Sequence, residues 1–185
     1  MRKVFWQIST TLDGFMEDSE KKLELTAQIE DEEFEAYASK MLESIGAFVV
    51  GRKTYELFVS YWPTATGRDA EILNSLPKYV VSTSLDQVEW NNAELISGDI
   101  EERIRTLKGQ DGGEIAVFGS ATLASSLLDM GLIDECRIMI TPYLLASGSR
   151  TFRADGAPRG LNLTGFERWN SGTVFLTYAP DRDPH

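Results

Sequence analysis

Histidine and cysteine are almost absent from this chain of 185 residues. The only histidine is His185, and the only cysteine is Cys136. A Ser-His-Asp triad, a histidine-rich zinc site, a CxxC redox pair and a disulfide framework all need more of these residues, so the sequence excludes them. Cys136 begins an alternating apolar run that ends at Ile140. We expect it to be a buried strand residue, because free cysteine packs as a small hydrophobe.

Long hydrophobic runs and an excess of positive charge are also missing. No apolar run approaches the ~20 residues of a membrane span. The formal net charge is −11, which disfavours binding to nucleic acid or to anionic membranes. The chain enters a strand pattern at once, without a signal-peptide pattern. We therefore expect a cytoplasmic protein whose partner is a small molecule, and its length and ordinary composition favour one domain, residues 1–185.

A G-x-G-x-x-G fingerprint is the last notable absence. The pair Gly112-Gly113 precedes a predicted strand, whereas the glycines of that fingerprint follow one. A Rossmann-type dinucleotide site is therefore disfavoured.

Apolar periodicity predicts strands that alternate with helices, followed by an all-β end. The predicted strands are 3–10, 47–50, 78–83, 93–96, 114–118 and 134–141, the helices are 31–45, 54–61, 69–76, 99–107 and 120–129, the loops include 17–30 and 142–160, and a terminal hairpin joins 161–169 to 173–178. This order predicts an α/β fold: a mostly parallel central sheet with flanking helices and a C-terminal antiparallel β-hairpin. Ligands of such sheets bind beyond the carboxyl ends of the strands.

The segment after the strand 47–50 has the composition of an anion site. Gly51 is followed by two cations, Arg52 and Lys53, and by Thr54, a possible N-cap of the next helix. Backbone N–H groups at a helix start, the helix dipole and an arginine together favour phosphate. An ordinary strand-to-helix turn with two solvated cations is the alternative.

Two further strand ends carry small or hydroxylated residues. They are Ser82-Thr83-Ser84 and Gly119-Ser120-Ala121-Thr122. Each segment also has a purely structural explanation: the first could be an ordinary turn, and the second could contain an ordinary helix N-cap. With the segment 51–54 they favour a dinucleotide that lies across the carboxyl edge of the sheet.

The motifs resemble those of the dihydrofolate reductase-like superfamily, and are nearest to the reductase domain of bacterial bifunctional riboflavin-biosynthesis deaminase-reductases. The similarity runs from about Val4 to Tyr178. The segments that carry it are Leu12-Asp13-Gly14, Gly51 to Glu56, Phe118 to Leu123 and Leu128 to Glu135.

This resemblance implies an NADPH-dependent reductase that transfers hydride to a small heterocyclic or related acceptor, for example 5-amino-6-(5-phosphoribosylamino)uracil. Arg52 and Lys53 suit the 2′-phosphate of NADPH, because an acidic residue is expected where a bare ribose binds. The relatives also imply a homodimer. The implied cofactor-binding residues are Gly51, Arg52, Lys53, Thr54, Ser82, Thr83, Ser84, Gly119, Ser120, Ala121 and Thr122.

Several positions depart from the family pattern. The zinc deaminase signature H-x-E…P-C-x-x-C is missing, so only the reductase half is expected. Phe15 stands where a lysine is usual, and residues 145–152 match the family loop only loosely. These gaps keep open a second reading, a nucleotide-binding module of the same fold without turnover. A purely structural protein, the third reading, would require the three strand-end motifs to be coincidental.

The catalytic and acceptor-binding residues are less well marked. Asp13 is a candidate acid or anchor, although an Asp before Gly also serves in plain turns. Glu35 is a candidate carboxylate that we interpret as a solvated helix residue. Tyr55 and Trp62 are candidates to line a flat acceptor, with core packing as the alternative.

Overall fold

The structure, a computed structural model, describes residues 1–19, 32–153 and 158–181 of the chain. Most of the predicted loop 17–30, from residue 20 onward, lies outside these ranges, as do residues 154–157 of the predicted loop 142–160. The main sheet consists of β1 (Val4–Thr11), β3 (Ile45–Gly51), β4 (Lys78–Val81), β5 (Ala93–Ile96), β6 (Glu114–Phe118), β7 (Glu135–Thr141), β9 (Leu161–Arg168) and β10 (Val174–Pro180).

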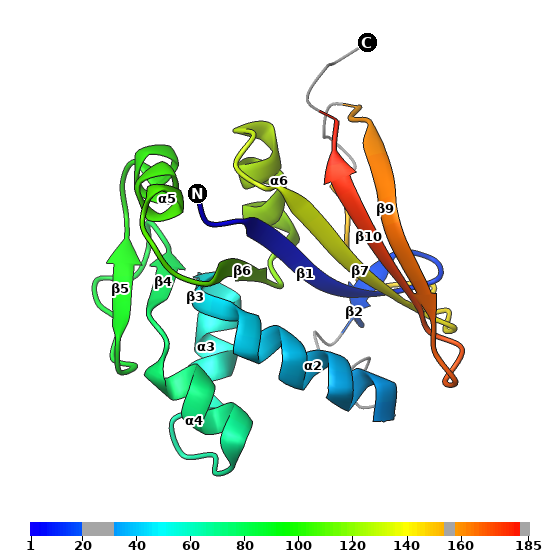
Figure 1. Ribbon diagram of the computed structural model, residues 1–185, viewed down its shortest axis with the longest axis horizontal. Helices are drawn as coiled ribbons and strands as arrows, with labels where there is room; N and C mark the ends of the chain where they lie inside the picture. Colours follow the sequence, from blue (N-terminus) through cyan, green and yellow to red (C-terminus); the bar gives the residue numbers. More distant parts are fainter. Residues whose placement is uncertain (20–31, 154–157, 182–185) are drawn as a thin grey trace.

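The main sheet is mixed and mostly parallel, as the sequence predicts. Its strand order is β5-β4-β3-β6-β1-β7-β10-β9. The strands from β5 to β7 all pair in parallel, whereas β10 pairs antiparallel with β7 and with β9. Figure 1 shows the hairpin of β9 and β10 at one end of the sheet. The predicted fold class is confirmed.

A second, two-stranded sheet was not predicted. It pairs β2 (Phe15–Glu17) with β8 (Ser149–Arg150) in antiparallel fashion. Strands of three and two residues are too short to show alternation, and their pairing joins positions more than 130 residues apart. The stretch 142–160 is thus not entirely a loop.

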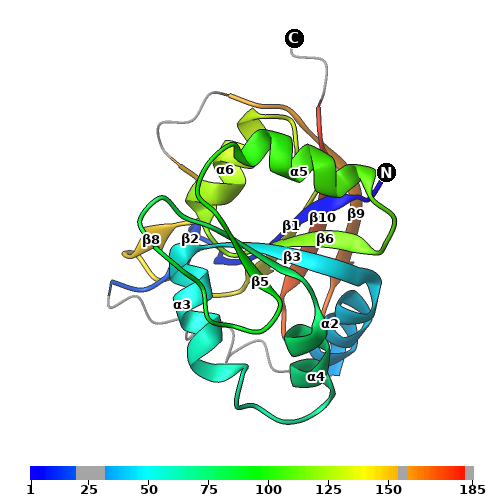
Figure 2. The ribbon, with the colours of Figure 1, turned by 90° about the vertical axis from the view of Figure 1, so that its left-hand side faces the viewer.

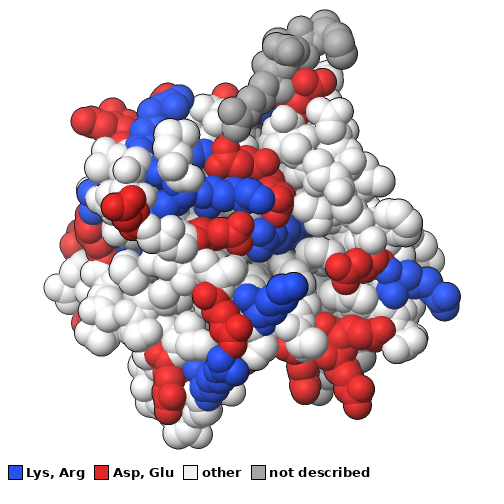
Figure 3. Space-filling view, in the orientation of Figure 1, with Lys and Arg blue, Asp and Glu red and all other residues white. Residues whose placement is uncertain are grey.

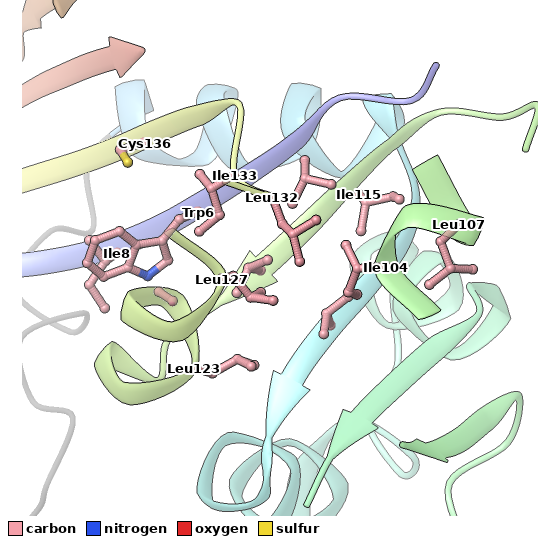
Figure 4. Close-up of a cluster of buried hydrophobic side chains, with 14 of the residues drawn as sticks. Trp6, Ile8, Ile104, Leu107, Ile115, Leu123, Leu127, Leu132, Ile133 and Cys136 are labelled. Carbon is pink, nitrogen blue, oxygen red and sulfur yellow. The ribbon is translucent and has the colours of Figure 1, made fainter. Parts of the chain in front are cut away.

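The described helices cover both faces of the main sheet (Figure 2). One face packs against α5 (Ile100–Gly109) and α6 (Ala121–Asp129), and the other against α2 (Glu32–Ser44), α3 (Arg52–Tyr61) and α4 (Arg68–Ser75). Alternate residues of one strand supply the two cores: Trp6 and Ile8 of β1 pack under α6, while Phe5 packs on the opposite side. Figure 4 shows the first of these clusters, with Leu123 and Leu127 of α6 facing the strands.

The helix starts agree only in part with the expected caps. Asp99 caps α5, since its carboxylate accepts a hydrogen bond from the Glu102 N–H at 3.0 Å. The prediction of Thr54 as an N-cap is wrong, because α3 already begins at Arg52, with Gly51 as the N-cap residue and no side-chain cap. The helix start is therefore closer to the end of β3 than the sequence suggests.

Candidate functional site

Three neighbouring parallel strands bring the candidate phosphate-binding segments together. β4, β3 and β6 are adjacent in the sheet and point the same way. Arg52 Nη1 donates a hydrogen bond to Ser84 Oγ at 3.0 Å, which joins the segment after β3 to the one after β4. A Cβ added to Gly51 would lie 2.9 Å from Ser120 Oγ, so the segment after β6 packs on the first. The segments 51–54, 82–84 and 119–122 therefore lie side by side.

Two glycines permit this close packing. Gly119 has a φ of +58°, a region that residues with a Cβ avoid, and a Cβ there would lie 3.0 Å from Thr54 Oγ1. Gly51 has an ordinary φ of −79°, so only its approach to Ser120 requires glycine. Because α3 and α6 begin within two residues of these glycines, both helix starts present their free N–H groups at one edge of the sheet (Figure 2).

The two helix starts at this edge lack acidic residues. Among the helices in the described ranges, α2, α4 and α5 carry Asp or Glu in the first turn, whereas α3 and α6 carry none. Acidic residues normally stabilise a helix start because the dipole is positive there. The start of α3 instead carries Arg52 and Lys53 and has no side-chain cap. Such a start favours an external anion.

Arg52 is held in place by two side chains. Its Nε donates to Glu56 Oε1 at 2.6 Å and its Nη1 to Ser84 Oγ at 3.0 Å. A guanidinium carries five N–H groups, so three remain beyond these two bonds. The Arg52 side chain is half exposed and Lys53 is exposed, so both can reach a ligand from solvent.

The hydroxyl groups after β4 differ in their surroundings. Ser82 is buried, and its Oγ accepts hydrogen bonds from the backbone N–H groups of Ser84 and Leu85, both at 3.1 Å. Thr83 and Ser84 are exposed. Ser82 thus shapes the turn, while the Ser84 hydroxyl accepts the hydrogen bond from Arg52 and lies 3.3 Å from Ser82 Oγ.

The residues after β6 mostly build the start of α6. Ser120 Oγ accepts a hydrogen bond from the Leu123 N–H at 3.3 Å, which is the plain N-cap role. Ala121 is buried and Thr122 is exposed. The backbone N–H groups here, with the Thr122 hydroxyl, are what this segment can offer an anion.

Trp6, which no sequence motif marks as functional, supports the glycine turn. Trp6 Nε1 donates to the Gly119 carbonyl oxygen at 3.1 Å. The exposed ring of Phe152 meets the Trp6 ring edge-to-face, with 5.7 Å between centroids. The apolar alternation of β1 predicts a buried Trp6, but its bond to Gly119 depends on a contact 113 residues away.

Asp13 ties two loops together. Its carboxylate accepts hydrogen bonds from the Thr11 hydroxyl at 2.6 Å and from the backbone N–H groups of Leu145 at 3.2 Å and Ala146 at 2.8 Å. The Thr11 hydroxyl, aided by these N–H groups, lowers the pKa of Asp13. A carboxylate stabilised in its charged form carries a proton less often at a given pH, so these contacts favour the anchor role of Asp13 over the acid role.

Tyr55 and Trp62 do not line this edge. Tyr55 is 6% exposed and its hydroxyl accepts a hydrogen bond from the Glu89 N–H at 2.9 Å. Trp62 follows the last residue of α3, about 15 Å along the helix from Arg52, and packs on the Phe58 and Tyr61 rings. Both pack against the core on the same side of α3, which favours the core-packing alternative; their contact with the acceptor stays a prediction.

The α2 face of β1 holds a buried amide. The Tyr37 hydroxyl donates to Gln7 Oε1, and burial raises the pKa of Tyr37. Gln7 is 8% exposed, and its Nε2 has no hydrogen-bond partner among the residues that the structure describes. Glu35 is exposed in the first turn of α2, which agrees with a solvated helix residue.

The described part of the chain offers no site for metal binding or for thiol chemistry. These residues contain no cluster of His, Cys, Asp or Glu that could hold a metal ion. Cys136 is buried, and burial raises the pKa of its thiol to about 11, which makes the reactive thiolate scarce. Among the described helices, none combines the length and apolar character needed to cross a membrane.

Comparisons with known proteins identify the family and the fold of this chain. The family model described as RibD C-terminal domain matches residues 2–175. Two uncharacterized proteins of Bacillus subtilis strain 168 are similar along their lengths. YyaP is 28% identical over 182 residues, which cover 96% of this chain and 94% of YyaP. YwjB is 25% identical over 178 residues, which cover 96% of this chain and 98% of YwjB.

Solved structures share the fold at lower identity. A Shewanella sp. PV-4 protein assigned provisionally to riboflavin biosynthesis has a TM-score of 0.76 at 22% identity, covering 97% of this chain and 99% of that one. A Thermotoga maritima deaminase and 5-amino-6-(5-phosphoribosylamino)uracil reductase has a TM-score of 0.69 at 14% identity, covering 97% and 57%. An Enterococcus faecalis dihydrofolate reductase complexed with NADP(H) has a TM-score of 0.63 at 12% identity, covering 97% and 96%.

Proposed function

This chain belongs to the RibD C-terminal domain family, and we propose that it is a single-domain, NADPH-dependent reductase that transfers hydride to a small heterocyclic or related acceptor. The observation that carries the proposal is the meeting of segments 51–54, 82–84 and 119–122 at the carboxyl edge of the sheet. Two acid-free helix starts and a restrained arginine gather there.

The residues present suit the phosphates of NADPH. We assign the 2′-phosphate to Arg52, with Lys53, Thr83 and Ser84 beside it, because an arginine fork matches phosphate oxygens. We assign the pyrophosphate to the starts of α3 and α6, which the close packing of Gly51 on Ser120 and of Gly119 on Thr54 brings side by side. NADPH would supply the hydride, while the protein positions both reactants and excludes water.

The acceptor is proposed to bind near the carboxyl half of β1. Gln7 lies on the α2 face of that strand with its Nε2 unpartnered among the described residues. Leaving a buried donor unmatched costs about 1–3 kcal/mol, and a polar ring that reached this amide would relieve that loss. The uracil intermediate named for the Thermotoga maritima relative is the first acceptor to test.

A nucleotide-binding module without turnover is the second candidate. The observation in its favour is the bonding of Asp13: its carboxylate accepts hydrogen bonds from Thr11, Leu145 and Ala146, which disfavours it as the proton donor. Such a protein would bind NADPH and leave it unoxidised.

We also propose a homodimer in the cytoplasm. The surface that supports it is the outer strand β9, which ends the sheet and exposes Leu163 by 54% and Phe166 by 71%. Figure 3 shows a broad area without charged side chains over β10 and β9. A long edge strand with exposed apolar side chains favours association. Phe166→Glu should therefore yield monomers in sedimentation at a concentration where the parent protein is dimeric, and an unchanged mass would exclude this surface.

NADPH oxidation in the presence of candidate acceptors tests the function. We expect the parent protein to oxidise NADPH only when an acceptor is present. The Arg52→Ala variant should need a higher NADPH concentration for half-saturation. Binding of NADPH without oxidation, for every acceptor in a panel of pyrimidines and pteridines, would support the module without turnover. No binding at all would exclude both candidates.

A further inference from the structure

We propose that Glu56 is a positioning residue that holds Arg52 ready for the 2′-phosphate and thereby sets the preference for NADPH over NADH. This inference rests on the proposed function, since it concerns the same cofactor site. Glu56 itself does not touch the cofactor in this proposal. It acts through the guanidinium of Arg52.

Glu56 holds the guanidinium of Arg52 at its Nε side. Glu56 Oε1 accepts from Arg52 Nε at 2.6 Å, while Ser84 Oγ accepts from Nη1 at 3.0 Å. Two bonds at different nitrogens fix both the position and the plane of a rigid fork. The N–H groups that remain then point in one set direction, which a single bond would not achieve.

The charge order of this pair is unusual for a helix. In α5, Glu101 precedes Arg105 by four residues, the order that complements the helix dipole. In α3 the order is reversed: the cation Arg52 is the first residue, and the anion Glu56 lies one turn later. The reversed order contributes less to helix stability, so stability alone does not explain the pair.

The acidity of the protein strengthens this reading. At a net charge of −11, another carboxylate one turn from a phosphate site opposes the binding of an anion. A gain must offset that repulsion, and pre-ordering of Arg52 provides one. A free arginine loses rotamer freedom when it binds phosphate, whereas an arginine already held by Glu56 and Ser84 has lost that freedom beforehand.

Isothermal titration calorimetry of the full chain with NADPH and with NADH tests the role of Glu56. Glu56→Ala should raise the Kd for NADPH by roughly 3- to 10-fold, the factor expected from ordering one long side chain. The Kd for NADH should stay within about 2-fold, because NADH has no 2′-phosphate for Arg52 to bind. Glu56→Gln should stay near the parent value, since its amide oxygen can still accept from Arg52 Nε.

Two further variants separate positioning from general effects. In an Arg52→Ala background, Glu56→Ala should change the NADPH Kd by less than about 2-fold, because the group it positions is gone. Glu43→Ala is the charge-matched control: it removes an exposed partner of Arg68 near the amino end of β3, about 20 Å from Gly51. It should leave both Kd values unchanged.

The outcomes distinguish this inference from the proposed function. Tighter NADPH binding by Glu56→Ala would show that the carboxylate only repels the phosphate, and an unchanged Kd would show that it does nothing. Either result overturns the inference while the cofactor site stands, provided that Arg52→Ala weakens NADPH binding. If the parent protein does not bind NADPH, the proposed function fails first.

Discussion

Replacing Gly51 by alanine should force apart the strand ends that form the proposed cofactor site. The new Cβ would lie 2.9 Å from Ser120 Oγ and 3.3 Å from Ser120 Cβ; apart from its chain neighbours, no other heavy atom of the described residues lies within 4 Å of it. Its backbone is not strained, because φ is −79°. The destabilisation must therefore come from displacement of Ser120, whose Oγ caps α6 through the Leu123 N–H.

The size of the effect follows from three terms. Loss of an N-cap costs about 0.5–2 kcal/mol and overpacking about 1–3 kcal/mol, while the reduced freedom of the unfolded chain returns about 0.4–1 kcal/mol. Together these terms span a net loss of about 0.5 to 4.6 kcal/mol. Because the atom nearest the new Cβ is the movable end of a serine side chain, a loss toward the low end, about 1–2 kcal/mol, is expected. For a domain of this size the melting temperature should fall by roughly 2 to 8 °C.

The double variant Gly51→Ala/Ser120→Gly is the sharper test. Ser120→Gly removes both atoms that the new Cβ would meet, and it relieves the positive φ of +40° at that position. By itself it should change stability by only a few tenths of a kcal/mol, because glycine also serves at N-caps. The double variant should then match Ser120→Gly alone, with a coupling of about 1–2 kcal/mol.

Urea unfolding of the parent and the three variants measures this coupling. Gly109→Ala is the control, since in the described part of the chain only the adjacent backbone of α5 lies near the Cβ that it would add. It should not destabilise the protein. Additive losses in the double variant would mean that the segments after β3 and β6 do not touch, which would refute the arrangement of the site.

Two further predictions concern pH. The pKa of Asp13 is lower in the folded chain than in the unfolded chain. Its charged form therefore stabilises the fold above the unfolded pKa, and this stabilisation is lost as the pH falls through the folded pKa. Below about pH 4, the urea midpoint of Asp13→Asn should therefore drop less than that of the parent protein. Lys78 is fully buried, and burial lowers its pKa from 10.5 to about 8. The unfolded chain then binds more protons between these values, so the free energy of unfolding should rise from about pH 8 to 10.5, by an amount of the order of 3 kcal/mol. Lys78→Met should lack this rise, and an equal rise in the variant would show that Lys78 is not its source.

Much of the fold follows from local patterns. Short apolar runs bounded by glycine, such as 47–50, identify the central strands because both faces of a parallel sheet are buried. The turn 170–172 between two alternating runs identifies the C-terminal hairpin. The three segments at the carboxyl edge could be grouped from sequence because parallel strands end on the same side.

Other features depend on contacts that no local pattern contains. The hydroxyl of Tyr55 accepts its hydrogen bond from the Glu89 N–H, 34 residues later in the sequence. Helix periodicity alone therefore could not show whether Tyr55 packs in the core or contacts a ligand. The Asp13 carboxylate accepts hydrogen bonds from the backbone N–H groups of Leu145 and Ala146, which are more than 130 residues away in the sequence. The β2–β8 pair was missed for the same reason.

The central claim is that NADPH binds at the carboxyl edge through Arg52, and a thermal melt with each nucleotide tests it most directly. At about 100 times its Kd, NADPH should add ~2.7 kcal/mol and raise the melting temperature by roughly 5 to 10 °C, with a smaller shift for NADH. Arg52→Ala should lose most of the NADPH shift, whereas Arg105→Ala, which changes an exposed arginine on α5, should keep it. Equal shifts with both nucleotides in the parent and in Arg52→Ala, or no shift at all, would contradict the account.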